Sequence, residues 1–184
     1  MEACKSLAIQ NFSNFEVCIS DDCSTDGREK EIFDFLNQSK LSFFYKKQGQ
    51  NRRYDANLRE AIAMARGQFC LLLGNDDVLA SSTVLEELYA DLKDFGKIGV
   101  VISNYADFST GRQFRRVKKT DILGAGPEAA IRYFRSFSFV SGILLRTSLS
   151  KEFFTKKWDG SEMYQMFIGC RILAKGFQDR KSVV

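Results

Sequence analysis

The chain has 184 residues, of which 45% are hydrophobic and 27% are charged, and its formal net charge is +4. This composition suits one globular domain with its own core and argues against long disordered segments. No stretch approaches the roughly 18 apolar residues that a membrane-spanning helix needs. The N-terminal MEACKSLAIQNF lacks the features of a signal peptide. The mild positive charge permits an anionic ligand without requiring a nucleic acid.

The histidine and cysteine content limits the catalytic and metal-binding chemistry that is open to this chain. The chain contains no histidine, which excludes Ser-His-Asp and Cys-His catalysis as well as zinc bound by histidine. The five cysteines are odd in number and form no CxxC pair, so free thiols in a reducing compartment are expected. Acid–base chemistry must therefore use Asp, Glu, Lys, Tyr or Cys, and any metal would be a hard cation such as Mn²⁺ or Mg²⁺.

Strand-forming runs alternate with runs of helical period along the first part of the chain. In chain order, the pattern predicts a strand at 15–20, a helix at 27–38, a strand at 41–46, a helix at 54–67 that stops at Gly67, a strand at 68–74, a helix at 81–96 and a strand at 98–104. Such alternation predicts an α/β fold with a mostly parallel, Rossmann-like sheet and helices on both faces.

The second part of the chain has a weaker pattern. Its predicted elements are a polar, basic segment at 105–121, a helix at 126–137, a strand at 138–147 and a helix at 161–176. No domain boundary is visible. We therefore expect residues 1–184 to form a single domain, with a regular half at 1–104 and a less regular half at 105–184.

Two acidic clusters directly follow predicted strands. The first is SDDCSTDG at 20–27, and the second is GNDDVL at 74–79. Because ligands of such sheets bind beyond the carboxyl ends of the strands, both clusters are expected at the same edge. Adjacent carboxylates repel one another, and a cation or ligand hydroxyl groups would neutralise the second cluster. The alternative is a polar turn between strand and helix, which explains one carboxylate better than two.

The first cluster also has the spacing of a calcium-binding loop that starts at Asp22. The twelfth position of that loop is Phe33, where a bidentate Glu is required. A polar turn in which Ser24 or Asp26 caps the following helix is the simpler interpretation, and it leaves Asp22 available for another role.

Two further segments carry weaker signals. GAG at 124–126 lacks the third glycine of a dinucleotide-binding loop. The basic residues of 105–121 suit either a solvated surface loop or a loop that meets phosphates, and without interleaved aromatic residues they fit nucleic-acid recognition poorly. These residues are Arg112, Arg115, Arg116, Lys118 and Lys119.

Three segments together resemble family 2 glycosyltransferases with the GT-A fold. SLAIQNFSNFEVCISDDCSTDG resembles SL..Q.F..FEIIIVDDGSTDGT, and ANLREAIAMARGQFCLLLGNDDVL resembles A.N.GI..A.GEYI.FLDSDD. FVSGILLRTSL is similar to the segment ahead of the acceptor site. The likeness covers most of the chain, and it implies a nucleotide-sugar donor, a divalent metal and inversion at the anomeric carbon.

The resemblance assigns roles by position. Asp22 would contact the nucleotide base, Asp76 would lie near the ribose, and Asp77 would coordinate the Mn²⁺ or Mg²⁺ that bridges the diphosphate. Arg52 or Arg53, which precede the helix beside the donor, would add positive charge there.

An inverting transfer also needs a base for the acceptor hydroxyl, opposite the leaving group. The family has an Asp or Glu at the start of a late helix, and WDGSEMYQ offers Glu162, with Asp159 as the alternative. Otherwise Glu162 only stabilises the N-terminus of that helix through the helix dipole.

The chain departs from the family pattern at three places. It begins at MEACKSLAIQ, in what should be the helix after the family's opening strand, so that strand is missing. Gly74 and Asn75 replace the first positions of the family's DxDD-like motif, and the chain stops at KSVV, where many relatives continue. A sheet without its first strand should expose an apolar gap and bind the donor weakly, unless another chain covers that gap.

We therefore expect an enzyme that moves a sugar from a nucleotide donor, first of all a UDP-sugar, to a saccharide or lipid-linked acceptor in surface polysaccharide synthesis. We expect it to act in the cytoplasm. The sequence is also compatible with peripheral association at the inner face of the membrane and with oligomer formation. The alternatives are a catalytically impaired remnant that serves as a binding or assembly module, and a phosphate binder that uses the basic loop.

Overall fold

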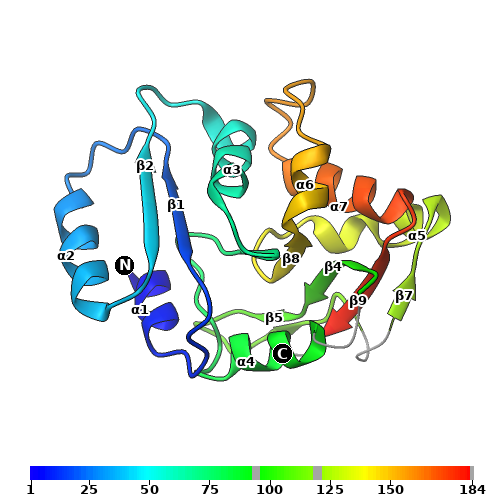
Figure 1. Cartoon of the computed structure of the whole chain (residues 1–184), viewed down its shortest axis with the longest axis horizontal. Coiled ribbons are helices and arrows are strands. Elements are labelled where there is room, and N and C mark those ends of the chain that lie inside the picture. Colours follow the sequence, from blue (N-terminus) through cyan, green and yellow to red (C-terminus); the bar gives the residue numbers. More distant parts are fainter. Residues whose placement is uncertain (93–95, 118–121, 183–184) are drawn as a thin grey trace.

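The computed structural model describes residues 1–92, 96–117 and 122–182, and Figure 1 shows how their elements are arranged. The helices are α1 (Glu2–Ala8), α2 (Glu29–Ser39), α3 (Arg53–Met64), α4 (Val84–Leu92), α5 (Pro127–Tyr133), the 3₁₀ helix η1 (Phe134–Phe137), α6 (Thr147–Glu152) and α7 (Tyr164–Ala174). The strands are β1 (Val17–Asp21), β2 (Phe43–Lys47), β3 (Phe69–Leu72), β4 (Ile98–Ser103), β5 (Tyr105–Ala106), β6 (Gln113–Phe114), β7 (Ile122–Gly124), β8 (Ile143–Arg146) and β9 (Gln178–Ser182). Of the helices in these ranges, none combines the length and apolarity required to cross a membrane.

The described strands form three sheets. β1 and β2 pair in parallel, β5 and β6 form a short antiparallel ribbon, and the main sheet has the order β3-β8-β4-β9-β7. Within the main sheet β4 and β9 are parallel, whereas β8 is antiparallel to β3 and β4, and β7 is antiparallel to β9. The α/β class is confirmed. The main sheet is more mixed than the sequence pattern predicts, because β8 returns between β3 and β4 in the opposite direction.

The core lies on both faces of the main sheet, with β4 at its centre and all six β4 residues buried. Val100 and Ile102 pack on one face with buried residues of α3, α6 and α7. Val101 and Leu144 pack on the other face with Val84 and other apolar residues of α4. Helices therefore cover both faces, as the alternation of strands and helices predicts.

The sheet is interrupted between β1 and β3, which belong to separate sheets. On the edge of β1 that faces away from β2, the Ser20 carbonyl accepts a hydrogen bond from Asn57 Nδ2 of α3 at 3.0 Å. Figure 1 shows α3 between the β1–β2 pair and the helices over the main sheet. Within the described residues, contacts of helix α3 therefore connect the β1–β2 pair to the main sheet and its helices.

Two element boundaries differ from the prediction for clear local reasons. Helix α3 ends at Met64 instead of Gly67, because Ala65 is extended (ψ 132°) and the carboxylate of Glu16 accepts the N–H groups of Arg66 and Gly67. The strand predicted at 138–147 is limited to β8, because the chain passes directly from β8 into α6. Periodicity does not reveal α6, because the same apolar residues suit a short strand or a buried helix.

Gly99 allows the closest contact between β4 and its covering helix. A Cβ at this position would lie 2.5 Å from Ile172 Cγ2 and 2.7 Å from Phe177 Cβ. We predict that Gly99→Ala lowers the free energy of unfolding by about 1–3 kcal/mol, because the added methyl group overpacks this contact. Urea denaturation measures the change. Gly96→Ala is the matched control, since a Cβ there meets no atom within 4 Å; equal stabilities of the two variants would contradict the assignment.

Candidate active site

The turn that follows β1 contains the first acidic cluster. Asp21 accepts hydrogen bonds from the Tyr45 hydroxyl at 2.5 Å and from the Ser24 N–H at 2.7 Å. Burial by itself would raise the pKa of Asp21, but these hydrogen bonds outweigh it and leave the pKa lowered. The sequence suggests no role for Asp21. In the structure its ionised carboxylate holds the turn together through these two hydrogen bonds.

Asp22 and Arg52, both predicted to meet the donor, lie together at the ends of β1 and β2. Asp22 Oδ1 accepts the N–H of Arg52 at 2.7 Å. The Arg52 guanidinium donates to Gln48 at 3.4 Å, and Gln48 donates to the Ser20 hydroxyl at 3.3 Å. Arg53 is the next residue and is exposed, with a left-handed backbone (φ +64°) at the first position of α3. Polar groups of two strands and one helix thus meet at this edge.

The predicted capping of α2 by Ser24 or Asp26 is wrong. Arg28 occupies the N-cap position, and no side chain caps the helix. Asp26 instead accepts the N–H of Arg28 at 3.2 Å, one residue before the helix begins. The polar residues of this turn therefore stabilise the turn itself and not the first turn of α2.

The second acidic cluster is built around Gly74. The Ser141 hydroxyl donates to Asp77 Oδ2 at 2.5 Å and accepts the N–H of Gly74 at 2.7 Å. A Cβ on residue 74 would lie 2.7 Å from Asp77 Oδ2 and 3.0 Å from Asp76 Oδ1. The glycine that replaces the family's first acid therefore gives both carboxylates the space in which they converge. The sequence offers no signal for Ser141, because it comes from a distant segment.

The oxygen donors at this turn suit a hard divalent cation whose coordination is completed by a substrate. In the described ranges, no three or more His, Cys, Asp or Glu side chains gather into a metal-binding group. Mg²⁺ in phosphate-transferring sites commonly uses one or two protein carboxylates together with substrate phosphates and water. Asp76 and Asp77 provide that number of carboxylates.

Arg116 adds a positive charge near Asp77. Its guanidinium lies over the rings of Tyr105 and Phe139, at 4.9 and 5.3 Å from their centroids, and donates to the Ser141 carbonyl. Burial lowers the pKa of Arg116 to about 10, against the opposing effects of Tyr105 and Asp77, so the side chain remains charged at neutral pH. Its Nε is buried and has no hydrogen-bond partner among the described residues.

The interpretation of the basic segment as a solvated loop is therefore wrong for Arg116. Arg112 and Arg115 are exposed, as that interpretation predicts. Lys118 and Lys119, which were considered with them, lie outside the described residues.

The two candidate bases lie on the loop between α6 and α7 and differ in their surroundings. Asp159 accepts two hydrogen bonds from the Arg59 guanidinium, at 2.6 and 2.8 Å, and this pairing with Arg59 lowers the pKa of Asp159. Glu162 is exposed, and its backbone is left-handed (φ +58°). Glu162 precedes Met163, the N-cap residue of α7, so it lies just before this helix, which begins at Tyr164 and not at 161 as the sequence pattern predicts.

Hydrogen bonds of Gln165, which follows this loop, hold the segment that leads to the second acidic cluster. Gln165, in the first turn of α7, accepts the Tyr54 hydroxyl of α3 at 2.9 Å and donates to the Ser138 carbonyl at 3.2 Å. The same 138–141 segment ends at Ser141, which binds Asp77. Residues that are far apart in sequence are thus placed around α3 and the segment before β8.

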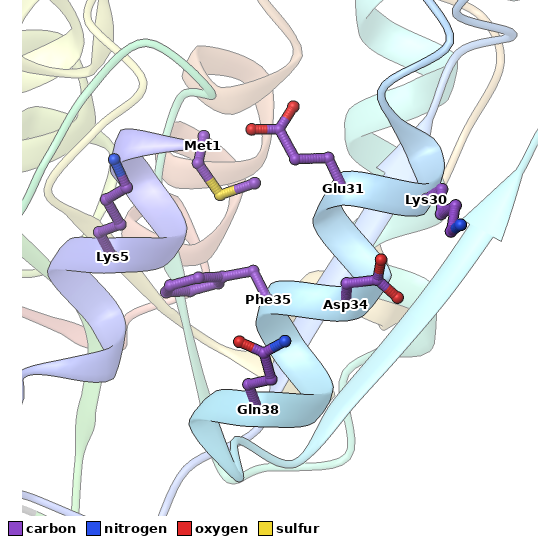
Figure 2. Close-up of a pocket in the computed structure, with 7 residues that line it drawn as sticks. All are labelled: Met1, Lys5, Lys30, Glu31, Asp34, Phe35 and Gln38. Atoms are coloured by element: carbon purple, nitrogen blue, oxygen red, sulfur yellow. The ribbon is translucent and has the colours of Figure 1, made fainter.

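A surface pocket between α1 and α2 lies apart from these residues. Figure 2 shows side chains from both helices around it, and the lining residues are Met1, Lys5, Lys30, Glu31, Asp34, Phe35 and Gln38. None of the predicted site residues lines this pocket. The candidate active site is therefore the polar edge described above.

Several solved structures share this fold. S. aureus TarS (residues 1–349) superposes with a TM-score of 0.75 at 24% identity, covering 100% of this chain and 53% of TarS. TarS in complex with UDP-GlcNAc gives a TM-score of 0.78 at 20% identity over 98% of this chain and 51% of that one. The mannosyltransferase PcManGT from Pyrobaculum calidifontis, in complex with GDP-Man and Mn²⁺, gives 0.71 at 15% identity over 97% of this chain and 49% of that one. The fold is therefore that of a GT-A glycosyltransferase domain.

The sequence comparisons define the family. The family model described as Glycosyl transferase family 2 matches residues 2–169, and the chain belongs to this family. The abequosyltransferase RfbV of Salmonella typhimurium is 34% identical over 79 residues, which cover 42% of this chain and 24% of RfbV. The chain thus spans about half the length of these structural neighbours and a quarter of this relative.

The ion pair of Asp159 gives a pH-dependent prediction. Its folded pKa is lowered by Arg59, so the pair contributes stability above the unfolded pKa of about 3.9 and loses it as the pH falls through the folded pKa. We expect Asp159→Asn to lower the free energy of unfolding by about 1 kcal/mol at pH 7. Denaturation series at decreasing pH should show the difference from the parent protein begin to shrink near about pH 4 and vanish as the pH falls through the lower folded pKa. A difference that stays constant with pH would argue against this pairing.

Proposed function

We propose that the protein is a metal-dependent, inverting glycosyltransferase that uses a nucleotide-sugar donor. The observation that carries the proposal is the convergence of Asp76 and Asp77 over Gly74 after β3, together with the Asp22–Arg52 contact beyond the parallel β1–β2 pair. Such polar groups beyond strand ends are suited to a nucleoside diphosphate and its cation.

A UDP-sugar is the donor that we propose. Support comes from TarS, which has been solved with UDP and with UDP-GlcNAc, and whose fold this chain shares. Asp22 would contact the base and Asp76 the ribose. Arg52 and Arg53 would place positive charge beside the diphosphate.

Asp77, with Asp76 beside it, would hold Mn²⁺ or Mg²⁺. When bound, the cation would neutralise charge that develops on the leaving diphosphate. The hydrogen bond from Ser141 orients the Asp77 carboxylate. Arg116, held by the carbonyls of the 136–141 segment, would add a fixed positive charge on the same side.

Glu162 is the base in this proposal. Its carboxylate is exposed, and no hydrogen bond or ion pair engages it within the described part of the chain. It is therefore available to accept the proton of an acceptor hydroxyl as the sugar is transferred. Asp159 is a poorer base, because both of its oxygens are bound by Arg59 and its pKa is lowered.

The remaining assignments extend this proposal. Residues 1–104 would bind the donor, and residues 105–184 would bind a saccharide or lipid-linked acceptor in surface polysaccharide synthesis. The five cysteines are unpaired, which suits a reducing, cytoplasmic location. Peripheral membrane association and oligomer formation are compatible with this assignment.

A binding or assembly module without catalytic turnover is the second candidate. The interruption between β1 and β3 favours it, because the two turns of the candidate donor site then follow strands of separate sheets. Turnover of the donor by the purified chain separates the two candidates.

We predict that the chain binds UDP in the presence of Mn²⁺ and that Asp77→Ala weakens this binding at least about tenfold, because the carboxylate that holds the cation is lost. Isothermal titration calorimetry measures both affinities. Asp34→Asn, an exposed change on α2, is the control and should bind like the parent. Undiminished binding by Asp77→Ala, or none by the parent, would defeat the proposal.

We predict that Glu162→Gln lowers turnover about 100-fold or more while UDP binding is retained, because the general base is removed without disturbing the donor site. Donor hydrolysis with Mn²⁺, followed as UDP release, measures this effect. Asp159→Asn should lose less activity than Glu162→Gln. Full activity in Glu162→Gln would remove Glu162 from the mechanism.

A further inference from the structure

The loop that presents Glu162 requires an external support. It joins α6 to α7, and its residues 156–163 are exposed. Glu162 has a left-handed backbone, which is unfavourable for a residue with a side chain. Such a conformation persists only where surrounding contacts enforce it.

Asp55 of α3 provides that support. The residue is buried, with 1% of its surface exposed. Oδ2 accepts the N–H groups of Gly160 at 2.8 Å and of Glu162 at 2.9 Å, and Oδ1 accepts the N–H of Tyr164 at 3.0 Å. The backbone of the left-handed residue is therefore bound directly, together with the residues two positions before and after it.

Arg59, one helical turn after Asp55, holds the earlier part of the same loop. Its guanidinium binds both oxygens of Asp159 and donates to the Thr155 carbonyl at 2.8 Å. It also lies 5.1 Å from the ring centroid of Tyr164. Because residues four apart share one helix face, Asp55 and Arg59 act as a pair that fixes the loop at both ends.

The same helix is bound to the predicted donor site. Asn57 accepts the Ser20 hydroxyl at 2.6 Å and donates to the Ser20 carbonyl at 3.0 Å. The N–H of Arg52, immediately before α3, binds Asp22. Helix α3 therefore connects the turn that is proposed to meet the nucleotide with the loop that carries the proposed base.

We propose that Asp55 is a positioning residue that sets the backbone of Glu162, and thereby the direction of its carboxylate, relative to the donor. This inference rests on the proposed function. Asp55 itself is not placed to act as the base, because it is buried and its oxygens already accept backbone N–H groups. A carboxylate is needed here because only two acceptor oxygens satisfy N–H groups on both sides.

Asp55→Asn tests the proposal. The amide retains one acceptor oxygen, and its NH₂ group cannot accept the remaining backbone N–H groups. We expect kcat for Mn²⁺-dependent donor hydrolysis to fall about 10- to 100-fold, because misplacement of a catalytic group by about 1 Å has effects of this size. We expect the KM for donor and the calorimetric Kd for UDP to change less than about twofold, since the donor site is held by the opposite face of α3. Asp34→Asn serves as the matched control and should leave both constants unchanged.

The outcomes separate this inference from the function on which it rests. If Glu162→Gln is inactive and Asp55→Asn retains the full kcat, the positioning role is overturned while the proposed function stands. If Asp55→Asn loses kcat and UDP binding together, its role is only structural and the inference fails. If Glu162→Gln is fully active, the proposed function itself fails.

A second variant covers the case in which Asp55→Asn does not fold. Arg59→Lys keeps the positive charge but removes the paired hydrogen bonds to Asp159, so it loosens the same loop from its other end. We expect a loss of kcat of about tenfold with the UDP Kd unchanged. An unchanged kcat, or a parallel loss of UDP binding, would overturn the proposal.

Discussion

The buried carboxylate of Asp55 is the interaction on which the arrangement of the site depends. Burial of a charge is unfavourable unless hydrogen bonds compensate for it, and here the backbone N–H groups of three residues provide them. These hydrogen bonds hold the exposed loop between α6 and α7 in one conformation. Since Asp55 belongs to α3, the position of Glu162 is determined by a helix whose other face binds Ser20 of β1. The two halves of the site are thus related through one rigid element.

The second cluster follows the same principle of support by distant residues. Ser141, two residues before β8, binds Asp77 and Gly74 through one hydroxyl group. Arg116 is held over two aromatic rings and binds the carbonyl of the same serine. Asp77, in the first half of the chain, is therefore oriented by residues of the second half.

The sequence predicts much of this arrangement. The residues that it does not predict are those whose roles depend on contacts with distant segments. The strands before both acidic clusters are predictable, because short apolar runs end at polar turns. Asp55, Ser141 and Arg116 are not, because their roles arise from contacts with segments more than 20 residues away. Arg116 lies in a basic stretch that resembles a solvated loop until its two aromatic neighbours are placed.

The central claim is that the acidic turn after β3 and the Glu162 loop face one bound donor and its cation. Paramagnetic broadening of backbone amide signals by Mn²⁺ in the presence of UDP tests it most directly. We predict that the amides of Gly74 and Asp77 broaden most strongly and that those of Gly160 and Glu162 broaden measurably, while amides of α2 remain sharp. Broadening that spares the Glu162 loop, or that is centred on α2, would contradict this account.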